Sequence, residues 1–181
     1  MKTGVVLIGM PGVGKSTVGI LLAKRIGLDF LDSDVFIQTR EGRRLWEIIQ
    51  EESLNGFCRI EERHVLSISP LGCVIATGGS VVYSKKAMAH LRSGGRIVHL
   101  DLEPALLQHR LDNMDARGVV RNPGQSVADL YRERNPLYRR YQDIRIDCGT
   151  MTPDEVVAAI VEKLQSFTSE KADEQTTPKR T

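Results

Sequence analysis

The feature that most constrains this chain is a glycine-rich stretch near its start, Gly9–Ser16, which reads G-M-P-G-V-G-K-S. It matches the pattern G-x-x-x-x-G-K-S/T completely, and that pattern forms a loop that binds phosphate groups. Glycines let the backbone curl so tightly that successive N–H groups converge on phosphate oxygens. The motif therefore predicts a strand before it, a helix after it and a bound nucleoside triphosphate.

The residues on either side of the loop fit these expected elements. Gly4–Gly9 is continuously apolar and rich in β-branched residues, as in a strand that is buried on both faces. Lys15–Ile26 gathers its apolar residues on one helical face, and Gly27 follows as a typical helix stop. Within the loop, Lys15 is expected to contact the β- and γ-phosphates, and the Ser16 hydroxyl is expected to bind Mg²⁺.

The rest of the chain alternates short apolar runs with longer amphipathic ones. This alternation predicts an α/β fold, a doubly wound parallel sheet that helices cover on both faces. The expected strands are Asp29–Asp32, Cys73–Thr77, Arg96–Leu102 and Ile144–Ile146. The expected helices are Leu45–Leu54, Phe57–Ile68, Lys85–Leu91, Pro104–Leu111, Val127–Tyr141 and Pro153–Phe167.

Composition argues against several classes of function. The 181 residues are 41% hydrophobic and 27% charged, with a net charge of +2, which does not favour binding to nucleic acid or to a membrane surface. No apolar run approaches the roughly 18–20 residues of a membrane span. The 3 cysteines are too few and too scattered for a disulfide framework. We therefore expect a reduced, cytoplasmic protein. We separately expect a monomer whose partner is a small molecule, although composition does not give the oligomeric state.

We expect one domain over residues 1–167, with two segments of special function. Residues 33–68 are the expected acceptor-binding segment, because a chain this short has no room for a separate substrate domain. Residues 112–125 are polar, contain glycine and proline and are long for a connection, which favours a lid. Residues 168–181 contain no large apolar residue, so we expect a disordered tail.

Two acids end the second expected strand. Asp32 and Asp34 stand at alternate positions, so both can point into the crevice above the carboxyl ends of the sheet. One carboxylate near Mg²⁺ and one near an acceptor hydroxyl would suit phosphoryl transfer. The alternative is that Asp34 only caps the following helix. The Gly78-Gly79 pair after the third strand likewise offers either bare backbone to a ligand or a simple tight turn.

Arginines form the other notable pattern. Between Arg110 and Arg145 the chain has arginine at eight positions and no lysine. Only arginine offers a planar fork that matches carboxylate or phosphate. We expect Arg117 to close over the transferring phosphate and Arg134 to hold an anionic acceptor, with most of the others at the surface.

With these motifs, residues 4–165 resemble the shikimate kinase family. The matching pieces are GMPGVGKSTVG, LDSD, GFCRIEERHVL, IATGG, HRLDNMDARG, ERNPLYRRY and TPDEV. The first is common to many nucleotide-binding proteins, whereas the later ones are quite specific to this family. The resemblance implies a P-loop three-layer fold, a five-stranded parallel sheet in the order 2-3-1-4-5 and a helical lid. It also implies ATP- and Mg²⁺-dependent phosphorylation of shikimate to shikimate 3-phosphate, in aromatic amino acid biosynthesis.

The resemblance also implies a role for each matching residue. Asp34 is the expected base and, with Gly78 and Gly79, would hold the acceptor hydroxyls, while Arg134 would meet its carboxylate. Ser16 and Asp32 would hold Mg²⁺. The residues that would contact ATP are Gly12, Val13, Gly14, Lys15, Ser16 and Thr17 at the phosphates, Arg117 from the lid, and Arg110 and Pro153 beside adenine.

Three positions depart from the family pattern. Cys58 stands where the family has an arginine that helps to hold the shikimate carboxylate, and a thiol cannot provide that contact. The loss of one charge-assisted partner would weaken acceptor binding by about ten- to a hundredfold. The lid continues from Arg117 with Gly-Val-Val instead of Pro-Leu-Leu, and the third glycine of the turn is Ser80.

Two other functions remain open at this point. One is a related kinase for another hydroxylated acid, a hydroxy amino acid or a cyclitol, which the replacement at Cys58 would suit. The other is a nucleotide-binding module without catalysis. The complete set of Lys15, Ser16 and the two acids argues against the second alternative, because an idle site need not keep it.

Overall fold

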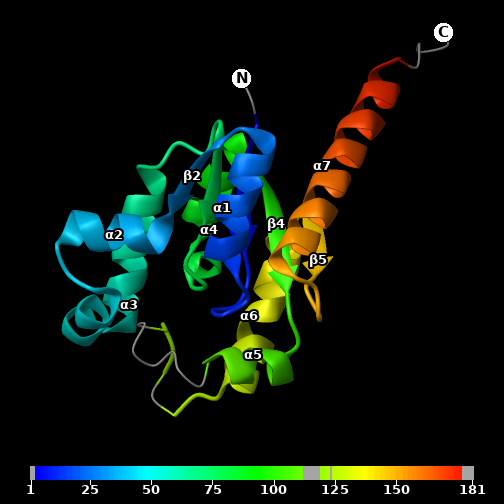
Figure 1. The fold of residues 1–181 in the computed structure, drawn as a ribbon. Helices are drawn as coiled ribbons and strands as arrows, with labels where there is room; N and C mark the ends of the chain where they lie inside the picture. Colours follow the sequence, from blue (N-terminus) through cyan, green and yellow to red (C-terminus); the bar gives the residue numbers. More distant parts are fainter. Residues whose placement is uncertain (1–2, 112–118, 123, 177–181) are drawn as a thin grey trace, which may run out of the picture.

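The computed structural model describes residues 3–111, 119–122 and 124–176 (Figure 1). Strands and helices alternate along the chain, as the sequence predicted. Their order is β1 (Gly4–Ile8), α1 (Lys15–Ile26), β2 (Asp29–Asp32), α2 (Ser33–Glu41), α3 (Leu45–Leu66), β3 (Cys73–Ala76), the 3₁₀ helix η1 (Val81–Tyr83), α4 (Lys85–Gly94), β4 (Gly95–Asp101), α5 (Pro104–Leu111), α6 (Val127–Tyr141), β5 (Ile144–Asp147) and α7 (Pro153–Thr176).

The strands form one parallel sheet in the order β2-β3-β1-β4-β5, which confirms the predicted order. The central strand β1 is buried over its whole length, as its continuous apolar sequence predicted. It pairs with β3 through Val5 and Val74 and with β4 through Val6 and Ile97. All strands therefore end at the same edge, where a ligand site of this fold class lies.

Helices cover both faces of the sheet. A Cβ at Gly19 of α1 would contact Leu7 of β1, whereas a Cβ at Gly95, the first residue of β4, would contact both Val6 of β1 and the backbone of Leu91 in α4. Because neighbouring residues of a strand point to opposite faces, α1 and α4 lie on opposite sides of the sheet. Helix α7 packs beside α1 (Figure 1), and α6 packs against β4. This arrangement confirms the predicted three layers.

Helix α2 and the first part of α3 lie at the left in Figure 1, whereas Val65 near the end of α3 belongs to the main core. The sequence predicted two helices here, Leu45–Leu54 and Phe57–Ile68, and α3 does consist of two helices that meet at a kink. The kink lies at Ser53, whose φ of 63° and ψ of 170° are not helical. Ile37 of α2 packs with three residues of α3 in an apolar cluster separate from the main core: Leu45, Ile48 and Phe57.

The C-terminal helix differs from the expectation. Helix α7 continues to Thr176, although the sequence predicted that the folded part ends at residue 167 and that a disordered tail follows. Residues 168–176 contain neither glycine nor proline, and Glu, Lys, Ala and Gln favour a helix once the preceding turns are formed. Among the described residues, no helix is long and apolar enough to cross a membrane.

Candidate active site

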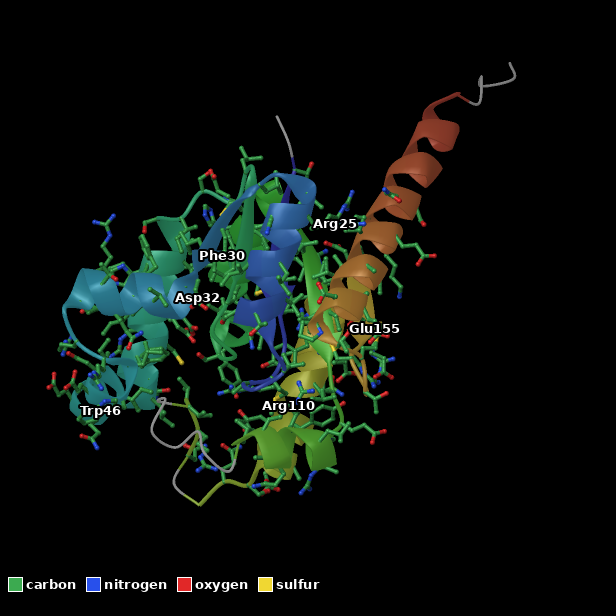
Figure 2. The ribbon with its side chains drawn as sticks, viewed as in Figure 1. Arg25, Phe30, Asp32, Trp46, Arg110 and Glu155 are labelled. Carbon is green, nitrogen blue, oxygen red and sulfur yellow. The ribbon has the colours of Figure 1, made fainter. Side chains whose placement is uncertain are left out.

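The carboxyl edge of the sheet borders a cleft of about 800 Å³. Its walls come from the loop after β1, the β2–α2 junction, the turn after β3, and from α3, α5, α6 and α7. Figure 2 shows Asp32, Trp46 and Arg110 on three different elements around it. Most of the residues predicted to act do line the cleft: Gly12, Val13, Gly14, Lys15, Ser16, Thr17, Asp32, Asp34, Gly78, Gly79, Arg110, Arg134 and Pro153.

The loop between β1 and α1 has a backbone that only glycine adopts readily. Gly9, Gly12 and Gly14 have φ angles of 144°, 80° and 104°. At Gly9 a side chain would also have no room, since a Cβ would come within 2.3 Å of the carbonyl oxygen of Leu100. Gly14 is the N-cap of α1, so the unpaired N–H groups of the first turn lie at the cleft.

Lys15 lies at the base of the cleft and is 8% exposed. Its Nζ donates hydrogen bonds to the carbonyl oxygens of Gly9 and Met10, at 2.9 and 2.8 Å. Burial lowers the pKa of Lys15 to about 8, and the nearby carboxylate of Asp34 opposes this effect. The ammonium group is thus charged at neutral pH, and phosphate oxygens would be stronger partners for it than two neutral carbonyl groups.

Ser16 and Asp32 form the predicted oxygen pair. Ser16 Oγ donates a hydrogen bond of 2.6 Å to Asp32 Oδ2. The other carboxylate oxygen of Asp32 accepts from the N–H groups of Asp34 and Val35, so Asp32, and not Asp34, is the N-cap of α2. This leaves the Asp34 carboxyl free for the cleft.

This oxygen pair fits Mg²⁺, which prefers hard oxygen ligands. The described residues hold no cluster of three or more His, Cys, Asp or Glu side chains that could bind a metal by themselves. Mg²⁺ in phosphoryl-transfer sites usually takes only one or two protein ligands and completes its shell with phosphate and water. Ser16 and Asp32 match that pattern.

The carboxyl group of Asp34 lies beside the turn after β3, and so does that of a second buried acid, Glu61 of α3. A Cβ at Gly78 would lie 2.7 Å from Asp34 Oδ1 and 2.4 Å from Glu61 Oε1, so these oxygens are within about 5 Å of each other. Burial, and then the charge of Asp32, raises the pKa of Asp34 to about 6. Burial, and then the charge of Asp34, raises the pKa of Glu61 to about 8. Both acids therefore keep their protons to a higher pH than exposed carboxyl groups do, and Asp34 is the more acidic of the two.

The cation at the other side of this turn is Arg134 of α6, which is 1% exposed. Its Nη1 has no hydrogen-bond partner among the described residues and lies 3.0 Å from a Cβ placed at Gly79. The N–H of Gly78 already donates to Ser33 Oγ at 2.9 Å. The site therefore combines a phosphate loop, two buried acids and a buried cation whose Nη1 has no hydrogen-bond partner in the described part of the chain.

Comparison with known proteins assigns this arrangement to one family. Residues 11–165 match the family model described as shikimate kinase. The chain belongs to the shikimate kinase family. It is 38% identical to the shikimate kinase of Aromatoleum aromaticum over 90% of this chain and 95% of that protein. The shikimate kinase of Pseudomonas entomophila is 37% identical, over 90% and 96%.

A solved structure of the same family has the same fold. It is the shikimate kinase from Acinetobacter baumannii in complex with shikimate, which matches with a TM-score of 0.86 and 27% identity. The match covers 92% of this chain and 95% of that one. As a shikimate kinase family member, the chain is an ATP-dependent phosphotransferase that uses Mg²⁺ and acts on a small molecule.

Two of the predicted site residues are not among the described residues that line the cleft. Arg117 lies outside the described residues, as does most of the expected lid. Cys58 is half-buried on α3 and is not among the described residues that line the cleft, although it lies near enough to Glu61 and Arg134 to feel their charges. Burial raises the pKa of the Cys58 thiol, so the group is neutral at working pH. Arg110 Nη1 reaches the carbonyl oxygen of Val13 at 3.4 Å, at the predicted nucleotide side.

The sequence did not identify three residues that lie around this cleft: Glu61, Tyr83 and Tyr138. A signal for Glu61 was present, since it is one helical turn from both Phe57 and Val65, on the buried face of α3. The only signal for Tyr138 was its spacing of four from Arg134. Tyr83 lies in a short 3₁₀ helix, and nothing in the sequence indicated its contact with a distant arginine.

Proposed function

We propose that this protein transfers the γ-phosphoryl group of ATP to a hydroxyl group of shikimate and forms shikimate 3-phosphate for aromatic amino acid biosynthesis. The observation that carries the proposal is the meeting of Lys15, Asp34 and Arg134 in one cleft. These residues supply a phosphate-binding cation, a carboxylate base and a cation for an acidic acceptor. Family membership supplies the reaction class.

On the nucleotide side, the backbone N–H groups of Gly12–Thr17 would surround the phosphates of ATP. Lys15 would leave its two carbonyl partners and neutralise charge that develops on the transferring group. Ser16 and Asp32 would hold Mg²⁺, which when bound neutralises charge on the phosphates. Arg110 and Pro153 line the same cleft and would flank the adenine ring.

On the acceptor side, Asp34 would orient the hydroxyl group and take its proton. Its position suits this role, because its carboxyl group is free of the helix cap that Asp32 provides. Burial raises the pKa of Asp34 to about 6, which brings the base closer to the pH at which it works. The backbone at Gly79 and the free Nη1 of Arg134 would hold the rest of the acceptor.

The direct test is ADP release with ATP, Mg²⁺ and a panel of hydroxylated compounds that includes shikimate. We expect shikimate to give the highest kcat/KM. The panel also needs hydroxy amino acids, sugar acids and uncharged cyclitols. A Lys15→Ala variant serves as the control for contaminating kinase activity, since it should release no ADP above background.

Cys58 supports a second candidate, a kinase for another hydroxylated acid, hydroxy amino acid or cyclitol. An acceptor that needs only one cation would suit a site with a neutral thiol at this position. The same panel separates the two candidates, because a different best acceptor would replace shikimate. ADP release that no acceptor stimulates would instead indicate a nucleotide-binding module.

Three further expectations belong to this proposal. The protein would act in the cytoplasm as a monomer, without nucleic acid or membrane as a partner. Residues 112–125 would act as a lid that brings Arg117 to the phosphates and excludes water during transfer. Residues 1–167 would form the single catalytic domain.

A further inference from the structure

Arg134 is a buried cation with unusual surroundings. Among the described residues, no carboxylate forms an ion pair with it. A buried charge of this kind needs other partners to fix its position, because burial without them is costly. Its contacts among the described residues include a tyrosine hydroxyl, a tyrosine ring and one backbone carbonyl group, and Tyr138 is near enough to interact with its charge.

Tyr83, in η1, provides two of these contacts. Its hydroxyl oxygen accepts a hydrogen bond of 3.0 Å from Nε of Arg134, and its ring centre lies 5.1 Å from Cζ of the guanidinium group. The same hydroxyl group donates to Glu133 Oε1 at 2.5 Å. Glu133 therefore orients the hydroxyl group so that its lone pairs face Arg134. Burial raises the pKa of Tyr83, which keeps the phenol protonated for this donation.

The three nitrogens of the guanidinium group are thereby placed in different situations. Tyr83 holds Nε, and the carbonyl oxygen of Val120 accepts from Nη2. Nη1 has no partner in the described part of the chain and lies beside Gly79 at the cleft. A planar group that is fixed at two nitrogens can present the third in only one direction.

We propose that Tyr83 is a positioning residue that fixes Arg134 so that Nη1 faces the anionic group of the acceptor, with Glu133 orienting the Tyr83 hydroxyl. The proposal rests on the proposed function in one respect, namely that the acceptor carries an acidic group. It gives this chain a way to bind such a group with one arginine, because Cys58 provides no second cation. A group that is fixed before binding loses less freedom when the acceptor arrives.

The test is Tyr83→Phe, which removes the hydroxyl group and keeps the ring. We expect the KM of the acidic acceptor to rise about five- to tenfold, because a hydrogen bond that fixes a charged group is lost. We expect kcat to stay within about twofold and the KM of ATP to stay unchanged, since Tyr83 has no described contact with the phosphate loop. Glu133→Gln should raise the acceptor KM by less, since the hydroxyl group keeps a weaker partner.

The matched control is Tyr131→Phe on the same helix as Arg134. Its hydroxyl group also donates to a carboxylate, Asp101, at 3.0 Å, but it is not among the described residues that line the cleft. This variant should leave both KM values unchanged. A merely structural role for Tyr83 predicts instead that melting temperature and all kinetic parameters shift together in Tyr83→Phe.

A second acceptor completes the test. With an uncharged cyclitol that the enzyme accepts slowly, the wild type and Tyr83→Phe should have equal KM values, because no acidic group engages Arg134. An unchanged KM for the acidic acceptor in Tyr83→Phe would overturn the positioning role while leaving shikimate phosphorylation intact. Failure of the proposed function would be seen earlier, in the wild-type panel itself.

Discussion

The hydroxyl group of Tyr138 donates a hydrogen bond of 2.7 Å to the carbonyl oxygen of Gly79, 59 residues earlier in the chain. Tyr138 is fully buried, and its ring stacks on His99 of β4 with ring centres 5.1 Å apart. Arg134 lies one turn before it on α6. This single bond therefore ties the glycine turn to the helix that carries the acceptor-binding cation.

Tyr138→Phe should destabilise the protein because it leaves the Gly79 carbonyl group without its partner. We expect a loss of about 1–3 kcal/mol in the free energy of unfolding, measured by urea titration. The acceptor KM should also rise, while the KM of ATP should not. Tyr141→Phe, at the end of the same helix, is the control and should change neither quantity. Equal stability of wild type and Tyr138→Phe would show that the bond is of no consequence.

Lys15→Ala should abolish phosphoryl transfer and leave the fold intact. The described partners of Lys15 are two carbonyl oxygens of the loop, so the fold depends little on it. We expect turnover to fall by about a hundredfold or more, because charge on the transferring phosphate is no longer neutralised. Circular dichroism should match that of the wild type. Lys24→Ala, in the exposed last turn of α1, is the control, and normal turnover in folded Lys15→Ala would refute the assignment.

Asp34→Asn should lower kcat far more than it changes the KM of ATP. The amide cannot take the proton of the acceptor hydroxyl, and a general base typically contributes about a hundredfold or more. Steady-state kinetics with each substrate varied in turn measures both quantities. If the variant loses ATP binding and keeps its turnover at saturating ATP, the assignment is wrong. Asp34 would then serve Mg²⁺ and Asp32 the acceptor hydroxyl.

Cys58→Arg should lower the KM of shikimate by about tenfold. Position 58 is three residues before Glu61 on α3, and Glu61 Oε1 has no hydrogen-bond partner in the described part of the chain, so the new guanidinium group would find an acid beside it. The KM of ATP should barely move. Loss of activity on the natural acceptor would indicate that this acceptor is not shikimate, because it would then carry no acidic group for the new guanidinium group to bind.

Stability at acid pH should depend on Glu41. Hydrogen bonds from His64, Arg43 and Arg63 lower the pKa of Glu41 from 4.5 to about 2 in the folded protein, against the opposing effect of burial. Its contribution to stability is therefore complete above pH 4.5 and is lost as the pH falls from about 4.5 to 2. Urea titrations at pH 5 and pH 3 measure the free energy of unfolding at each pH. Between these two pH values, this free energy should fall less in Glu41→Gln than in the wild type.

The control for this pH dependence is Glu51→Gln. Glu51 also accepts from Arg43, at 2.5 Å, but its side chain is 58% exposed, so solvent screens the pair. Between pH 5 and pH 3, the free energy of unfolding of this variant should fall as much as that of the wild type. If the free energy of unfolding of Glu41→Gln fell with pH as much as that of the wild type, the predicted role of Glu41 would be contradicted.

The fold and the nucleotide side were predictable from the sequence because they depend on local patterns. A buried strand, a glycine-rich loop and a helix follow one another within Gly4–Ile26, and each is encoded by its own residues. Parallel strands then bring the acids after β2 and the glycines after β3 to the same edge. The exact ends of the helices were less predictable, since the extension of α7 to Thr176 depends on helix propagation.

The acceptor side was harder to predict because its contacts join residues that are far apart in the sequence. Tyr83 meets Arg134 and Tyr138 meets Gly79 only when α6 packs against η1 and β4. Glu61 was part of a recognised motif, but the sequence did not indicate that Ser80 donates to its Oε2 while its Oε1 has no hydrogen-bond partner among the described residues. Such relations require three-dimensional coordinates.

The separate apolar cluster of Ile37, Leu45, Ile48 and Phe57 gives α2 and the first part of α3 a packing of their own beside the main core. A segment of this kind can open locally at a lower free energy than the main core, and hydrogen exchange would detect such opening. The segment that selects the acceptor is thus a different part of the chain from the loop that binds the nucleotide. Replacements in this segment, Cys58 among them, can change which alcohol the enzyme selects, while the machinery that handles the nucleotide stays as it is.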